Sequence, residues 1–148
     1  MQAWRIAAVP GLFGDGGRHV DGRWHSAPRS VLYAAEHPAL AMVEMMAHMH
    51  LSMEPGLTRL KIIHIEIRSG AVVSPMPELP EGWQTDELIT RALGNAWLDS
   101  GSALVLPVLS ARVPSATIYL INPMHPQAAT HLREISVAPF RFDSGVLR

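Results

Sequence analysis

The stretch Val31-Leu-Tyr-Ala-Ala-Glu-His-Pro38 marks the point where this chain is expected to change from strand to helix. Its first five residues form a short apolar run that is typical of a buried β-strand. Pro38 predicts a helix start, because proline in the first turn lacks an N–H group that would otherwise need a partner. We therefore expect a strand over 31–35 and then a helix from about Pro38 to about His50, apolar nearly all round and hence buried.

The segments on either side of this stretch predict more strands than helices. A glycine-rich loop is expected over 11–22. A second helix is expected to begin near Thr85, an N-cap candidate followed by two acidic residues, and to end at Gly101. Helices and strands do not alternate as a doubly wound sheet requires. We therefore predict an α+β fold in a single domain over 1–148, with further strands at 4–9, 60–67, 104–109, 116–121 and near 133–137.

The composition limits the class of protein. The chain has 148 residues, of which 48% are hydrophobic and 17% charged, enough to bury a core without disulfides. It has no cysteine, which excludes a thiol nucleophile and agrees with a reducing compartment. A net charge of -1 with scattered cations argues against direct nucleic-acid binding. No export leader and no apolar run of roughly 18 residues is present, so we expect a cytoplasmic protein without membrane contact.

Three patterns that often carry chemistry are weak in this chain. His48 and His50 lie two residues apart on the expected helix and point to different sides, so together with His64 they predict no metal site. The glycine-rich segment 14–18 lacks the Gly-Lys-Ser/Thr ending of a phosphate-binding loop. No Gly-x-Ser-x-Gly motif is present, which argues against a serine hydrolase.

Four polar residues lie in or beside apolar segments: Arg23, Tyr33, Glu44 and Ser110. Glu44 is the most informative, since an ionised carboxylate in an apolar helix is costly unless it is paired or functional. A structural ion pair of Glu44 with Arg23 or Arg5 is the alternative, and the residues alone favour it. Read alone, Tyr33 is a core tyrosine and Ser110 a turn residue.

Six short motifs follow one another over nearly the whole chain. They are Trp4-Arg5, Gly22-Arg-Trp-His25, Val31-Leu-Tyr-Ala-Ala35, Ala41-Met-Val-Glu44, Leu109-Ser-Ala-Arg-Val-Pro114 and Tyr119-Leu-Ile-Asn-Pro-Met-His-Pro126. In this order they resemble the motifs of the RES domain, a family named for Arg, Glu and Ser. The resemblance implies a fold similar to that of ADP-ribosyltransferases, with NAD as substrate and no further cofactor.

The same resemblance implies an active site. It carries over Arg23, Tyr33, Glu44 and Ser110 as catalytic residues, with Arg5, Arg23, Tyr33 and Asn122 as candidates for binding NAD. The family usually has Val-Pro-Ser at the serine motif, whereas this chain has Val108-Leu-Ser110 and then Val113-Pro-Ser115. We take Ser110 as the family serine because its distance from Asn122 along the chain fits, and Ser115 is too close.

Members of the family are toxins of toxin-antitoxin pairs. The resemblance thus implies an enzyme that breaks the nicotinamide–ribose bond and depletes NAD, by hydrolysis or phosphorolysis. A mono-ADP-ribosyltransferase that modifies a protein is the alternative, and an inactive binding module that uses the Met-rich segment 42–53 is the second alternative. The implied partner is an antitoxin with an Xre-type helix-turn-helix domain, which would carry any DNA binding. Family likeness alone suggests a homodimer.

Overall fold

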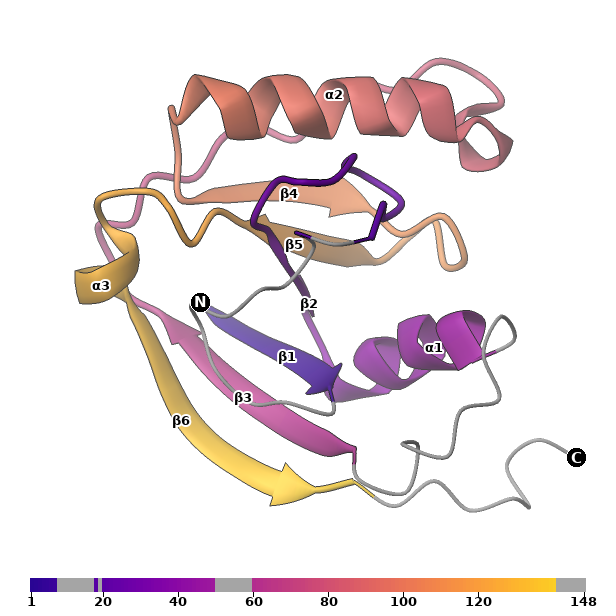
Figure 1. The fold of residues 1–148 in the computed structure, drawn as a ribbon. Helices are drawn as coiled ribbons and strands as arrows, with labels where there is room; N and C mark the ends of the chain where they lie inside the picture. The colour runs from indigo at the N-terminus through magenta and orange to yellow at the C-terminus, as the bar shows by residue number, and fades with distance from the viewer. Residues whose placement is uncertain (8–17, 19, 50–59, 141–148) are drawn as a thin grey trace, which may run out of the picture.

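The computed structural model describes residues 1–7, 18, 20–49 and 60–140, which build one six-stranded sheet with its helices (Figure 1). The strands are β1 (Gln2–Ala7), β2 (Leu32–Ala35), β3 (Lys61–Ile67), β4 (Val105–Leu109), β5 (Thr117–Ile121) and β6 (Leu132–Pro139). The helices are α1 (Pro38–Met49), α2 (Glu87–Ser100) and α3 (Ala128–His131), with a 3-10 turn over Trp83–Thr85 before α2. This architecture confirms the predicted α+β class.

The sheet has two well-paired halves. Its strand order is β4-β5-β2-β1-β3-β6, and every neighbouring pair is antiparallel. β1 pairs with β3 along its whole length, from Gln2 opposite Glu66 to Ala7 opposite Lys61. β1 and β2, by contrast, are in register at one position only, Trp4 opposite Ala35. The halves β4-β5-β2 and β1-β3-β6 therefore meet at a short seam between β1 and β2.

Apolar side chains pack on both faces of the sheet. On one face, three isoleucines of β3 pack with apolar residues of β4 and β5. Because side chains alternate along a strand, the intervening residues of β4 and β5 face the other way. There they pack with α2 and with the segment that precedes β2, in a second cluster that includes three buried tryptophans: Trp24, Trp83 and Trp97. Figure 1 shows α2 running along the outer side of β4. The second cluster thus fixes the segment before β2 against α2.

The helix predicted after β2 begins at Pro38 as expected, but it is not buried on all sides. Leu40, Ala41 and Met45 are buried, while Ala39 is exposed and Met42 is only half-buried. A helix that lies beside one sheet buries one face, and its other apolar residues stay in partial contact with solvent. The expectation of an all-round buried helix was therefore wrong. The predicted end of the helix at His50 lies outside the described residues.

The start of the second helix also differs from the prediction. Thr85 belongs to the 3-10 turn, where its hydroxyl bonds to the Gly82 carbonyl at 3.2 Å. Asp86 is the N-cap, since its Oδ1 accepts from the Leu88 N–H at 3.1 Å. Gly101 ends the helix as expected, with a φ of 61° that favours glycine. The prediction of Thr85 as N-cap was wrong because Thr85 is the last residue of the 3-10 turn, so the cap lies one residue later, at Asp86.

The remaining elements agree with the expected strands to within a few residues. The strand expected at 4–9 is β1, which starts earlier, and residues 8 and 9 lie outside the described residues. Most of the expected loop over 11–22 lies outside them too. The short helix α3 was not predicted, because four residues are too few to show helical periodicity.

Candidate functional site

A pocket of about 320 Å³ lies at the seam between β1 and β2. It is lined by side chains of β1, β2, α1 and the segment 20–25, and by the residues that follow β4. Four of the six predicted site residues line it: Arg5, Arg23, Tyr33 and Glu44. The sparse pairing between β1 and β2 leaves the space that these side chains surround. The pocket is therefore the candidate active site.

Glu44 and Ser110 contact each other directly. Ser110 follows β4, is 1% exposed, and donates from Oγ to Glu44 Oε1 at 2.6 Å. The same Oγ accepts the backbone N–H groups of Arg112 at 3.2 Å and Val113 at 3.0 Å. Because these two donors occupy the acceptor side of the hydroxyl, its single hydrogen points to the carboxylate. Ser115, the alternative serine, is exposed in the turn between β4 and β5.

The second carboxylate oxygen of Glu44 is the one available to a ligand. Within the described part of the chain, Oε1 bonds to Ser110 and Oε2 has no hydrogen-bond partner. Glu44 is half-buried in the pocket lining. An oriented carboxylate in a partly apolar cavity can stabilise a developing positive charge or accept a hydrogen bond from a hydroxyl.

Tyr33 projects from β2 into a small hydrogen-bonded group. Its hydroxyl accepts the Trp24 N–H at 3.1 Å and lies 2.6 Å from Nδ1 of His25, which is 2% exposed. Burial raises the pKa of the Tyr33 hydroxyl, and the Trp24 N–H opposes this only in part. Tyr33 therefore stays protonated and uncharged at neutral pH, with its ring at the pocket.

Gly22 permits this arrangement. A Cβ atom at position 22 would lie 2.5 Å from the Tyr33 hydroxyl and 2.6 Å from the His25 ring, closer than van der Waals contact allows. His25 was not predicted as a site residue, although it lies in the quoted motif Gly22-Arg-Trp-His25. A buried histidine next to the site has no signal of its own in the sequence, because only the fold shows that His25 pairs with Tyr33.

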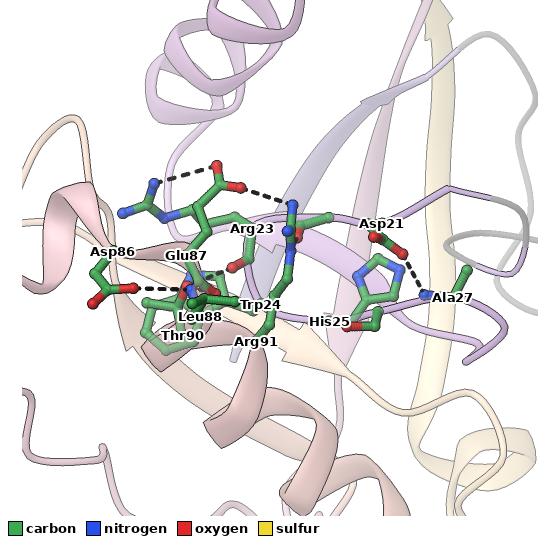
Figure 2. Close-up of polar contacts among 12 residues, drawn as sticks. Asp21, Arg23, Trp24, His25, Ala27, Asp86, Glu87, Leu88, Thr90 and Arg91 are labelled. Carbon is green, nitrogen blue, oxygen red and sulfur yellow. Dashed lines mark hydrogen bonds and ion pairs between the residues drawn. The ribbon is translucent and has the colours of Figure 1, made fainter.

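Arg23 lines the pocket, but its guanidinium is held by the 3-10 turn before α2 and by the first residue of α2. Nη2 donates to the carbonyl of Trp83 at 3.2 Å and to the carbonyl of Gln84, and Nη1 lies 3.6 Å from Glu87 Oε1. Figure 2 shows the Glu87 carboxylate between the guanidinium groups of Arg23 and Arg91, the latter at 2.7 Å. The predicted alternative of a direct Glu44–Arg23 ion pair was wrong, since among the described residues Arg23 pairs with Glu87 instead.

Successive turns of α2 hold the backbone of the segment before β2. Thr90 Oγ1 donates to the Arg23 carbonyl at 2.6 Å, and Arg91 Nε donates to the Gly22 carbonyl at 2.8 Å. Farther along the helix, Asn95 Oδ1 accepts the Ser26 N–H at 2.8 Å. Arg91 and Asn95 are four residues apart and share one face of α2, and Thr90 directly precedes Arg91, so this side of the helix positions the segment. The arrangement of the pocket wall depends on α2.

The two weaker candidates lie in different surroundings. Arg5 projects from β1 into the pocket lining, where burial lowers its pKa and the charge of Glu134 partly opposes the shift. Asn122, at the end of β5, is buried and accepts the Met124 N–H on Oδ1 at 3.0 Å. Asn122 is not among the residues that line the pocket. This hydrogen bond shapes the turn that follows β5.

The histidines that invited a metal interpretation have other contacts where they are described. His64 stacks on Trp4 with ring centroids 4.6 Å apart and bonds to Gln2 Oε1. The side chains of His48 and His50 lie outside the described residues. Over residues 1–7, 18, 20–49 and 60–140, no three His, Asp or Glu side chains gather as metal ligands would. Within these ranges no helix has the length and apolar character needed to cross a membrane.

Comparison with known proteins supports the family resemblance that the motifs indicated. The family model of the RES domain matches residues 2–143. A Pseudomonas putida protein named Toxin Res is 44% identical over 97% of this chain and 98% of its own length. A Yersinia enterocolitica protein of the same name is 32% identical over 88% of this chain and 86% of its own. A Sphingobium protein named Prs ADP-ribosylating toxin is 33% identical over 84% of both chains. With this match over almost its full length, the chain belongs to the RES domain family, whose fold is similar to that of ADP-ribosyltransferases.

Proposed function

We propose that this protein is a toxin that breaks the bond between nicotinamide and ribose in NAD and so depletes cellular NAD. The observation that carries the proposal is the carboxylate of Glu44, which faces the pocket while Ser110 holds one of its oxygens at 2.6 Å. Membership of the RES domain family and the toxin names of its relatives support the same function.

The chemistry needs few groups. As the bond between ribose C1′ and the pyridinium nitrogen breaks, both bonding electrons move to the nitrogen, and nicotinamide leaves as a neutral molecule. No general acid is required for this leaving group, unlike in ordinary glycoside hydrolysis. The ribose is left with oxocarbenium character, and water adds at C1′ with loss of a proton. Phosphate in place of water would give phosphorolysis.

Glu44 would act on the charge that develops at ribose. Its free Oε2 would accept a hydrogen bond from a ribose hydroxyl, and its negative charge would stabilise the oxocarbenium ion. Both interactions are stronger in the transition state than in the ground state, which is the condition for raising kcat. The ring of Tyr33 would pack on nicotinamide, and Arg5 and Arg23 would bring positive charge to the pocket.

Nicotinamide release tests the proposal. Purified chain is incubated with NAD, and free nicotinamide is quantified by chromatography for wild type, Glu44→Gln and Glu81→Gln. Glu81 is exposed and does not line the pocket, so it controls for loss of a carboxylate elsewhere. We expect Glu44→Gln to lower the rate by about 10²-fold or more, because it removes an aligned charge from the transition state. Equal release from Glu44→Gln and Glu81→Gln would contradict the proposal.

Transfer of ADP-ribose to a protein is the second candidate. One relative carries the name Prs ADP-ribosylating toxin, and the bond broken in NAD is the same. Mass spectrometry of products distinguishes the two reactions when acceptor proteins are supplied. Free ADP-ribose or its phosphate as the main product favours degradation, whereas modified protein as the main product favours transfer.

We also propose an antitoxin partner of the Xre helix-turn-helix type that covers the pocket.

An inactive binding module is the third candidate, and growth of cells that express the chain distinguishes it from both enzymes. A module that only binds would leave the phenotype unchanged in Glu44→Gln, whereas loss of toxicity in Glu44→Gln but not Glu81→Gln requires chemistry at Glu44.

A further inference from the structure

We propose that Arg112 supplies the anion-binding guanidinium of the pocket and holds the diphosphate of NAD, an inference that rests on the proposed function. NAD joins a positively charged nicotinamide riboside to a diphosphate with two negative charges. A pocket for NAD therefore needs a carboxylate at one point and a free cation a short distance away.

Arg23 is poorly placed to be the main diphosphate ligand. A guanidinium has five N–H donors. Both hydrogens of Nη2 go to the backbone carbonyls of Trp83 and Gln84, and Nη1 faces Glu87. Nε is buried and has no partner. With the side chain only 19% exposed, Arg23 brings charge to the pocket wall but has few donors left for a ligand.

Arg112 has the properties that Arg23 lacks. It lines the pocket and is exposed, and among the described residues its guanidinium makes no hydrogen bond and no ion pair. Its backbone is nevertheless fixed, because its N–H donates at 3.2 Å to Ser110 Oγ, the atom that also bonds to Glu44. The Arg112 side chain thus extends from a fixed backbone position, two residues after Ser110, which orients the Glu44 carboxylate.

The electrostatics of the pocket favour an anion at this place. The positive charge of Arg112 helps to lower the pKa of Arg23, although burial is the larger cause. Two cations that repel each other across one pocket are stabilised when an anion lies between them. A guanidinium can also donate two parallel N–H···O hydrogen bonds to one phosphate group, a geometry that a lysine cannot provide. The same chemistry would suit free phosphate as the acceptor in phosphorolysis.

Binding of ADP-ribose tests the assignment without turnover, since ADP-ribose carries the diphosphate and lacks nicotinamide. Calorimetry compares wild type, Arg112→Gln, Arg112→Lys and Arg133→Gln, with Arg133 chosen because it is exposed on β6 and does not line the pocket. We expect Arg112→Gln to weaken ADP-ribose binding by about tenfold or more, as for a lost charge-assisted hydrogen bond. Arg112→Lys should restore part of it, and Arg133→Gln should bind as wild type does. Equal affinities for Arg112→Gln and Arg133→Gln would overturn the proposal.

A parallel titration with inorganic phosphate separates the two sources of the anion. Weaker phosphate binding with unchanged ADP-ribose binding in Arg112→Gln would overturn the diphosphate assignment and place the acceptor phosphate there instead. Because Arg112 is exposed, we expect the variant to fold, and circular dichroism with a thermal melt checks this.

Kinetics give an independent readout. With NAD, Arg112→Gln should raise KM about tenfold and leave kcat within about twofold, the pattern of a group that binds ground state and transition state alike. With nicotinamide riboside, which has no phosphate, wild type and variant should have the same kcat/KM. An equal loss on both substrates would indicate a structural defect and overturn the proposal. If wild type releases no nicotinamide, the proposed function fails, while ADP-ribose binding still decides the role of Arg112.

Discussion

Ser110 donates a 2.6 Å hydrogen bond to Glu44 and thereby joins the end of β4 to α1 across 66 residues of sequence. Two backbone N–H groups that donate to the same oxygen leave the serine hydrogen only one direction. The serine therefore orients the carboxylate, and the carboxylate carries the proposed chemistry. Substitution of a residue that acts through another in this way should change kcat more than KM.

Replacement of this serine tests the relationship. Ser110→Ala removes the hydrogen bond to the charged acceptor Glu44, which contributes about 1.5–3 kcal/mol, together with the two hydrogen bonds that Oγ accepts from backbone N–H groups. If that energy is used in the transition state, kcat for nicotinamide release falls by about tenfold to a hundredfold while KM changes little. Ser115→Ala is the matched control, because Ser115 is exposed and not bonded to Glu44. A loss of kcat in Ser115→Ala with normal turnover in Ser110→Ala would reverse the assignment.

The tyrosines predict an unusual alkaline titration. The chain has two tyrosines, and burial raises the pKa of both Tyr33 and Tyr119 above the ordinary value of 10.0. The unfolded chain should show half-maximal tyrosinate absorbance at about pH 10, and the native chain should show less there. Ultraviolet absorbance against pH, with and without denaturant, measures the difference.

The same shift predicts how stability depends on pH. Above about pH 10 the unfolded chain loses tyrosine protons that the folded chain keeps, so the free energy of unfolding falls as pH rises, whereas below that pH these groups have no effect. Tyr33→Phe and Tyr119→Phe, measured separately by denaturant unfolding, should each reduce the alkaline slope. A native chain that titrates like the unfolded one would contradict the burial of Tyr33 described above.

Gly94 on α2 allows the helix to touch the segment before β2. A Cβ atom at position 94 would lie 1.6 Å from the carbonyl oxygen of Trp24, so Gly94→Ala must displace one or the other. Helix propensity alone would stabilise the alanine variant by about 1 kcal/mol. We expect the reverse, a loss of about 1–3 kcal/mol of unfolding free energy from overpacking.

The same displacement should reach the pocket. Trp24 N–H donates to the Tyr33 hydroxyl, so movement of Trp24 should raise KM for NAD in Gly94→Ala. Ala96→Gly, at an exposed position of α2, measures the propensity effect without the clash. If Gly94→Ala is as stable as wild type and has an unchanged KM, contact between α2 and this segment does not control the pocket.

Local patterns were sufficient to predict most of the elements and the family. Apolar runs placed five of the six strands within about two residues, since burial of a strand requires such runs. Pro38 and Gly101 marked a helix start and a helix end correctly. The backbone conformations that proline and glycine favour depend on the residue itself and not on its tertiary contacts. The cap at Asp86 was missed, since neighbouring Thr85 is also a good capping residue and the 3-10 turn that contains Thr85 is not visible in the pattern.

The contacts of the candidate site required the folded chain. Ser110 and Glu44 meet because the segment after β4 and helix α1 border the same pocket, and Arg23 turns to Glu87 because α2 lies against its segment. Asn122, a weaker candidate like Arg5, accepts the Met124 N–H after β5 and is not among the residues that line the pocket. A sequence specifies which side chains are available and which stretches are apolar, but the partner of a polar group is set by distances between elements far apart in the chain.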